Sequence, residues 1–182
     1  LQLLERDDIY DIGNRSPFFP SSVHIKDSPR FSYRGLMMDL SRHFYSLEFL
    51  QHVVDSLVAN KMNVLHLHIT DDQSFPMQSV QHPELSGNGS FGHDFVYTAE
   101  NMVIIVEYAF NRGVMIVAEF DMPAHSSSWS LGKPNIVVTG SGCNPKPLTH
   151  GGTLDPTKNE TYDLIRSFLS EMVHSVFQDE KV

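Results

Sequence analysis

Cysteine is almost absent from this sequence. Its 182 residues include only one, Cys143, which is either a free thiol or half of a disulfide whose partner lies outside the chain. Basic residues are also scarce, because 13 lysines and arginines stand against 22 aspartates and glutamates, for a net charge of −9. This charge argues against a general binder of nucleic-acid backbones.

Long apolar runs are absent too, since none reaches the length of a membrane span. No internal repeat or low-complexity tract is visible. Apolar residues make up 41% of the chain and charged residues 19%, as in soluble globular proteins. The N-terminal stretch LQLLERDDIYDIGNRS lacks the basic start and apolar core of a signal peptide and is more typical of the middle of a longer chain. Three glycosylation triplets suggest a secretory route; they begin at Asn14, Asn88 and Asn159.

Strands and helices are predicted to alternate along the chain. Short apolar runs predict strands at 34–41, 63–70 and 114–120. Apolar residues at helical spacing predict helices at 47–59, between Thr98 and Gly113, and at about 161–177. Ser46 and Thr98 are suitable N-caps for the first two helices. A loop rich in Gly, Pro, Ser and Asn is expected at about 123–156.

Apolar strands that alternate with amphipathic helices indicate a parallel sheet. Each predicted strand runs into polar residues: Asp39 to Arg42, Asp71 to Gln73, and Glu119 to Asp121 with His125 beyond. In α/β barrels the chemistry lies at the carboxyl ends of the strands, which favours a site there. A flavodoxin-like open sheet follows the same rule and stays open as the alternative. Three strand–helix units cannot close an eight-stranded barrel, so we expect a part of something larger.

A metal site is one interpretation of the two histidines in HLHITDD. His66 and His68 are two residues apart on a strand, so their side chains point to the same face. Together with Asp71 and His125 they could ligate zinc, as in metal-dependent barrel hydrolases. The alternative is that both imidazoles pack inside the sheet and are hydrogen bonded there. Further ligands of such a site are not visible, so we predict no metal and no cofactor.

Three other polar residues predict a site for a polar ligand. Arg42 can donate a forked pair of hydrogen bonds to vicinal hydroxyls, or it can form a surface salt bridge. Asp71 can orient the imidazole of His125, which is the usual way to tune an acid–base residue. The alternative is that these two are unrelated polar loop residues, which are common.

Five longer motifs follow one another along the chain: PRFSYRGLMMDLSRHF, NKMNVLHLHITDDQSFPMQS, YTAENMVIIVEYAFNRGV, AEFDMPAHSSSW and LDPTKNETY. Together, and in this order, they resemble the β-N-acetylhexosaminidases of glycoside hydrolase family 20, with the lysosomal enzymes nearest. The resemblance covers about residues 25–182. It implies that 25–182 are the N-terminal part of a (β/α)8 catalytic barrel, about strands one to three, truncated before strand four. Residues 1–24 would then be the end of a preceding small α/β domain or a linker.

The resemblance also implies an activity. These enzymes remove terminal β-linked N-acetylglucosamine or N-acetylgalactosamine by a retaining mechanism in which the acetamido group of the substrate is the nucleophile, an exception to the two-carboxylate rule. The expected partners are a glycan or glycoconjugate substrate and, in the full-length enzyme, a second subunit of a homo- or heterodimer. Lysosomal or secreted localisation is expected, with no nucleic acid and no membrane span.

The resemblance assigns roles to individual residues. Arg42 matches the arginine that holds the 3- and 4-hydroxyls of the terminal sugar. Asp71 and His125 match the catalytic relay to the acid glutamate, and Asp121 matches a supporting carboxylate. Cys143 matches a cysteine that, in the lysosomal members, pairs with a cysteine beyond strand four. Asn159 matches a glycosylation site that those members use.

The sequence also departs from the family pattern. It has His66-Leu67-His68 where HWH is commoner, and DMPAH where DTPGH is commoner. The HxGGDE motif, with the acid glutamate and the acetamido-orienting aspartate, does not occur in it. We therefore expect this chain alone to be inactive. The alternative functions are a non-catalytic glycan-binding or regulatory fragment and, third, a metal-dependent hydrolase that uses His66 and His68.

Overall fold

The structure, a computed structural model, describes residues 22, 24–138 and 152–177. The chain divides into two units, residues 1–32 and 33–182. In the first unit, the residues that the structure describes form no helix or strand. Most of segment 1–24 lies outside the described residues, so the predicted boundary of a preceding domain stays a prediction. Cys143 and Asn14 lie outside them as well.

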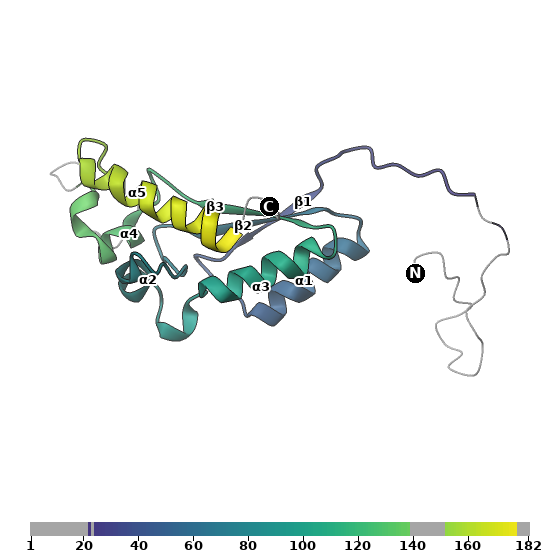
Figure 1. Cartoon of the computed structure of the whole chain (residues 1–182), viewed down its shortest axis with the longest axis horizontal. Helices are drawn as coiled ribbons and strands as arrows, with labels where there is room; N and C mark the ends of the chain where they lie inside the picture. Colours follow the sequence, from purple (N-terminus) through teal and green to yellow (C-terminus); the bar gives the residue numbers. More distant parts are fainter. Residues whose placement is uncertain (1–21, 23, 139–151, 178–182) are drawn as a thin grey trace. The chain divides into compact units, whose positions relative to one another are not determined.

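A three-stranded parallel sheet forms the centre of the second unit, with strand order β1-β2-β3 (Figure 1). The strands are β1 (Gly35–Asp39), β2 (Val64–Thr70) and β3 (Met115–Phe120). Neighbours in space are therefore also neighbours in sequence, as in a barrel. The flavodoxin-like alternative would place the first strand between the second and third, so it does not fit the described sheet.

Helices connect and follow the strands. The longer ones are α1 (Leu47–Ala59), α3 (Ala99–Phe110) and α5 (Asn159–Glu171), and α5 continues as the π-helical η3 (Met172–Phe177). The shorter ones are α2 (Pro83–Gly89), η1 (His93–Phe95), α4 (Ser127–Gly132) and η2 (Pro134–Ile136). Helices α1 and α3 lie side by side along the sheet (Figure 1), and η3 packs against α3. Among the described residues, no helix has the length and apolarity that crossing a membrane requires.

The predicted N-caps are confirmed. Ser46 accepts a hydrogen bond from the backbone N–H of Phe49, and α1 has the predicted bounds. Thr98 and Asn101 form a reciprocal capping box at the start of α3. Both arrangements satisfy backbone N–H groups that a helix start leaves without partners.

Other predictions were wrong in part. The expected loop at 123–156 contains α4 and η2, and α2 was not predicted at all, because helices of 6, 3 and 7 residues are too short to show a helical period in the sequence. The last helix begins at Asn159 and changes to π-helix at Met172, so it is not one regular helix at 161–177.

An aromatic cluster supports the segments beyond the strands. Phe75, Trp129 and Phe168 are fully buried and meet edge to face, with ring centroids 4.9 to 5.5 Å apart. They come from the segment after β2, from α4 and from α5. Such pairs contribute about 0.5–1.5 kcal/mol each beyond the area that they bury. The cluster therefore holds the polar segments after β2 and β3 in place.

A buried carboxylate fastens the end of α5 to the segment before α2. Glu171 accepts hydrogen bonds from the hydroxyl of Ser79 at 2.6 Å and from the backbone N–H groups of Val80 and Gln81 at 2.6 and 3.2 Å. Because a buried charge needs such donors, this contact fixes the position of the 79–81 segment relative to α5.

Candidate functional site

The carboxyl ends of the three strands meet at one edge of the sheet. The parallel register aligns Asp39 on β1 with His68 on β2, and His68 with Glu119 on β3. Arg42, Asp71 and His125 follow these three strand ends in turn. The tertiary structure thus brings together polar residues that the sequence separates widely.

The carboxylate of Asp71 is the centre of this cluster, and its side chain is only 1% exposed. Oδ2 lies 2.6 Å from Nη2 of Arg42 and 2.8 Å from Nε2 of His68. Oδ1 lies 3.0 Å from Nδ1 of His125. The three predicted residues Arg42, Asp71 and His125 are therefore in direct contact, and His68 joins them. Their roles toward a substrate stay predictions.

Residues of α4 hold the backbone beside this carboxylate. The hydroxyl of Ser128 donates to the carbonyl of Asp71 at 2.6 Å. The backbone N–H of Ser127 donates to the side chain of Asp72 at 2.9 Å. Since α4 is anchored by the buried Trp129, the position of Asp71 depends on the aromatic cluster.

The guanidinium of Arg42 has protein acceptors on three sides. Besides Asp71, it donates to Asp39 from Nη1 and to Gln73 from Nε, both at 2.8 Å. Burial acts to lower the pKa of Arg42, but the hydrogen bond to Asp39 and the charge of Asp71 outweigh it and raise that pKa. The side chain is 43% exposed. An arginine has five N–H groups, so a ligand that reaches Arg42 can still accept a forked pair of hydrogen bonds.

His125 is the exposed end of the cluster. Its side chain is 53% exposed, and its backbone has φ of 57°, in the left-handed region that few non-glycine residues adopt. Such conformations gather at functional sites. Asp121, the predicted supporting carboxylate, lies 3.8 Å from Nδ1 of His125, too far for a direct hydrogen bond.

The two strand histidines share one carboxylate. Nε2 of His66 lies 2.5 Å from Glu119, and Nδ1 of His68 lies 3.1 Å from the other oxygen of Glu119. The two rings thus lie on the same face of the sheet, as the spacing predicted. Glu119 was expected at a strand end, but no role was predicted for it. The sequence contained one clue, which is that the motif AEFD ends the strand expected to pair with the strand that contains HLH.

Two groups of side chains have the spacing of metal ligands. They are His68, Asp71 and Asp121, and Asp71, Asp72 and His125, with ligand atoms within 4.8 Å of one another. Nitrogen and carboxylate ligands of this kind suit zinc. However, Arg42 places a positive charge 2.6 Å from Asp71, where it would repel a bound cation. The hydrogen bonds of His66 and His68 to Glu119 compete with metal ligation as well.

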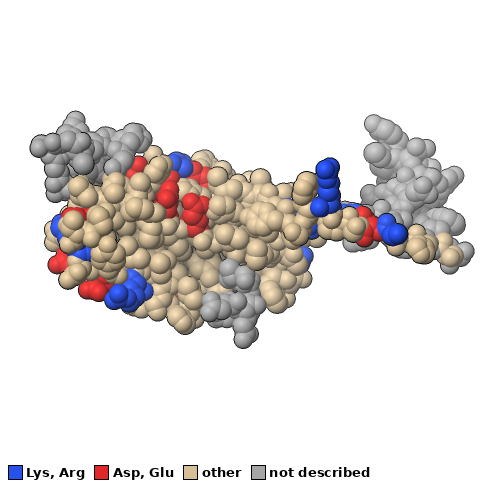
Figure 2. Space-filling view, turned by 90° about the horizontal axis from the view of Figure 1, so that it is seen from above, with Lys and Arg blue, Asp and Glu red and all other residues tan. Residues whose placement is uncertain are grey.

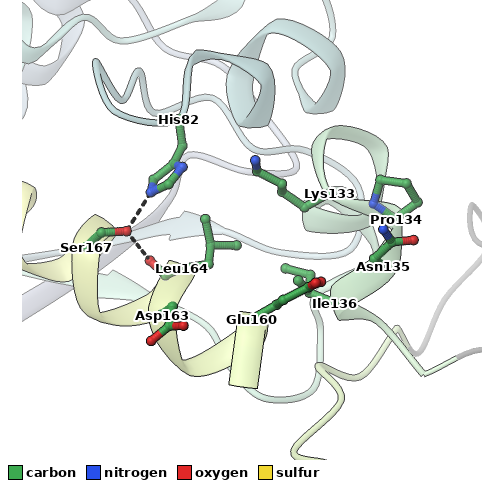
Figure 3. Close-up of a pocket in the computed structure, with 9 residues that line it drawn as sticks. All are labelled: His82, Lys133, Pro134, Asn135, Ile136, Glu160, Asp163, Leu164 and Ser167. Atoms are coloured by element: carbon green, nitrogen blue, oxygen red, sulfur yellow. Dashed lines mark hydrogen bonds between the residues drawn. The ribbon is translucent and has the colours of Figure 1, made fainter. Parts of the chain in front are cut away.

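A separate pocket of about 550 Å³ lies between α4, η2, α5 and the segment before α2 (Figure 3). Its lining consists of His82, Lys133, Pro134, Asn135, Ile136, Glu160, Asp163, Leu164 and Ser167. Nε2 of His82 lies 2.6 Å from the hydroxyl of Ser167. Lys133 is paired with Glu84 at 2.5 Å. The pocket contains none of the predicted site residues. Arg42, Asp71 and His125, which were predicted to bind or act on a ligand, lie in the strand-end cluster instead.

The face of the molecule drawn in Figure 2 does not have the charge pattern expected of a polyanion site. Figure 2 shows Lys and Arg side chains scattered beside Asp and Glu on this face, and they do not form a basic stripe. Electrostatic recognition of a phosphate backbone would require such a stripe.

Comparison with known proteins gives a consistent result. Residues 31–182 match the family model "Glycosyl hydrolase family 20, catalytic domain". The chain is 44% identical over 158 residues to beta-hexosaminidase subunit beta of Mus musculus, covering 86% of this chain and 29% of that protein. It thus spans less than a third of the length of that relative.

Solved structures agree with this match. The chitobiase of Flavobacterium johnsoniae superposes with a TM-score of 0.69 at 39% identity, covering 79% of this chain and 22% of that one. The β-N-acetylhexosaminidase of Streptomyces coelicolor A3(2) gives a TM-score of 0.70 at 31% identity, covering 82% and 32%. Such neighbours are (β/α)8-barrel enzymes, so the predicted fold class, a partial barrel of this kind, is confirmed.

Proposed function

Because the chain belongs to glycosyl hydrolase family 20, we propose that it takes part in the hydrolysis of terminal, non-reducing β-linked N-acetylhexosamine residues. The observation that carries this proposal is the buried Asp71 carboxylate, which contacts Arg42 and His125 at the carboxyl ends of parallel strands. A guanidinium for hydroxyls and a carboxylate–imidazole pair for proton movement are suited to one sugar ring bound at this edge.

Arg42 is proposed to bind the terminal sugar. A planar guanidinium can donate two parallel hydrogen bonds to a pair of vicinal hydroxyls, which a lysine cannot match. Its contacts with Asp39 and Asp71 fix the plane of the group before a ligand arrives. A fixed donor loses little conformational entropy on binding, so Arg42 can select the orientation of the sugar.

Asp71 and His125 are proposed to form the relay. Asp71 binds Nδ1 of His125, which leaves Nε2 for a third group. In a relay of this kind the buried carboxylate orients the imidazole and stabilises its charge, and the imidazole then adjusts the acid–base residue beside it. Asp121, 3.8 Å from His125, is proposed to add negative charge at this position.

The bond-breaking groups are proposed to lie in a further part of a longer protein. The HxGGDE motif is not found in the 182 residues. In the proposed reaction the acid of that motif protonates the leaving oxygen while the acetamido oxygen of the substrate attacks the anomeric carbon. Residues 31–182 then supply binding and the relay, with no metal or cofactor required.

A secretory route and assembly with a second subunit complete the proposal. Asn88 and Asn159 are exposed, so both glycosylation triplets are accessible to a glycan. The mouse relative is named as a subunit, which supports a dimer. A lysosomal or secreted location agrees with both features.

Binding of N-acetylglucosamine tests the proposal. The chain should bind this sugar, and Arg42→Lys should raise Kd at least about tenfold, since about 1.4 kcal/mol corresponds to a factor of ten. Arg166→Lys is the matched control, because Arg166 is 77% exposed and pairs only with Asp163 among the described residues. Equal affinities for all three proteins, measured by calorimetry, would overturn the assignment of Arg42.

A hydrolysis assay separates the enzyme from the glycan-binding alternative. The 182-residue chain should release no aryl leaving group from an aryl N-acetylglucosaminide above buffer. A longer protein that adds the HxGGDE segment should release it. Sugar binding without hydrolysis in the longer protein would favour the non-catalytic alternative.

A further inference from the structure

His68 lies between two carboxylates from different strands. Nε2 is 2.8 Å from Oδ2 of Asp71, and Nδ1 is 3.1 Å from Oε1 of Glu119. The side chain of His68 is 9% exposed, so water competes little for either nitrogen. Both ring nitrogens therefore face an acceptor at hydrogen-bonding distance.

This geometry determines the charge of the ring. A neutral imidazole has one N–H donor and one lone pair, whereas an ionised carboxylate only accepts. A neutral His68 would thus turn a lone pair toward the oxygens of Asp71 or Glu119. Only the imidazolium, with two N–H groups, satisfies both contacts.

We propose that His68 is held as an imidazolium between Asp71 and Glu119 and that it is a positioning residue for the Asp71 carboxylate. The charges around the ring are consistent with this. Asp39 and Arg42 approach from the β1 side, Glu119 and Asp121 from β3, and Asp71, His66 and His125 complete the surroundings. Four carboxylates thus lie around His68 against one permanent cation, the guanidinium of Arg42, and a charged imidazolium reduces this imbalance.

The pKa of His68 is raised, which favours the imidazolium. Burial by itself lowers it, but the hydrogen bonds to Asp71 and Glu119 outweigh burial and raise it above its ordinary value of 6.5. His66 contributes indirectly, because its ring binds the second oxygen of Glu119 and so keeps that carboxylate beside His68.

The positioning effect follows from which oxygens are used. His68 and Arg42 both bind Oδ2 of Asp71, at 2.8 and 2.6 Å. Nδ1 of His125 lies nearer to Oδ1, at 3.0 Å, than to Oδ2, at 3.2 Å. Two cations on Oδ2, together with the backbone N–H of Asp72 at 2.6 Å from Oδ1, hold the rotation of the carboxylate that presents Oδ1 to His125. The charge state of His68 does not depend on the proposed function. Its importance for a catalytic relay does rest on that function.

Nitrogen-15 NMR of the histidine rings tests the charge state directly. In the unmodified chain at pH 7, both nitrogens of His68 should carry protons, and the ring should titrate above pH 6.5. Glu119→Gln should move the titration midpoint down by about one pH unit or more, which corresponds to about 1.4 kcal/mol. Glu160→Gln, the same change on an exposed part of α5, should leave it unchanged. A bare nitrogen on His68 at pH 7 in the unmodified chain would overturn the proposal, even if the variants fail to fold.

The tautomer of His125 tests the positioning role. Neutral His125 should carry its proton on Nδ1, against Asp71, in the unmodified chain. His68→Gln keeps a hydrogen-bond donor but removes the charge, and it should produce a mixture of the two tautomers. An unchanged His125 tautomer would overturn the positioning role. Binding of N-acetylglucosamine to the unmodified chain is a separate measurement. If the chain does not bind this sugar although His68 is an imidazolium, only the proposed function is contradicted.

Discussion

Nη2 of Arg42 lies 2.6 Å from Oδ2 of Asp71, and the carboxylate is almost completely buried whereas the guanidinium is half-exposed. One charge is thus inside the protein and its counter-charge is at the surface, where a ligand can reach it. A buried charge is tolerated only with well-placed partners. The contact between Arg42 and Asp71 therefore contributes to the stability of the fold and also presents a charged group to a ligand.

Replacement of Asp71 should lower stability. Asp71→Asn leaves the buried His68 and the half-exposed Arg42 without the carboxylate that they share, and losing a hydrogen bond to a charged group costs about 1.5–3 kcal/mol. Urea unfolding at pH 7 should show this loss in the free energy of unfolding. Asp163→Asn, in an exposed pair with Arg166, should change it by less than about 1 kcal/mol. Similar values for the two variants would show that the Asp71 contacts add little stability.

Two glycines should respond in opposite directions to alanine. At Gly132 an added Cβ would lie 2.5 Å from the backbone oxygen of Glu84 and 2.8 Å from the Cα of Leu85, so Gly132→Ala forces α4 away from α2. Overpacking of this kind costs about 1–3 kcal/mol. Gly87 in α2 has no atom within 4 Å of such a Cβ, and Gly87→Ala should stabilise by about 0.5–1 kcal/mol. Thermal melts of both variants provide the measurement; a stabilised Gly132→Ala protein would contradict the close packing of α2 and α4.

Acidification should destabilise the pocket at His82. Burial lowers the pKa of His82 below 6.5, with a smaller opposing effect of Glu84. The unfolded chain then binds a proton more readily than the folded one, so this contribution to stability is complete above about pH 6.5 and is lost as pH falls through the folded pKa. Unfolding free energies between pH 7 and pH 5 should fall more for the unmodified chain than for His82→Gln. Parallel curves would mean that His82 titrates as in the unfolded state.

The regular elements were predictable where local chemistry and periodicity agree. Helix α1 has the predicted bounds because Ser46 supplies the cap and apolar residues recur at helical spacing. Helix α4 was missed because its sequence, SSWSLG, has little helical preference, and it is stable through the burial of Trp129 against Phe75 and Phe168. Tertiary packing, which a local pattern does not contain, decides such segments.

The sequence by itself determined the order of strands and helices, the polar residues that end each strand, and the motifs by which Arg42, Asp71 and His125 were predicted. Only the tertiary structure decided that the Asp71 carboxylate binds both Arg42 and His125, and that His68 stands between this carboxylate and Glu119. The physical reason is register: parallel pairing aligns His68 with Glu119, and neither residue alone carries information about its partner across the sheet.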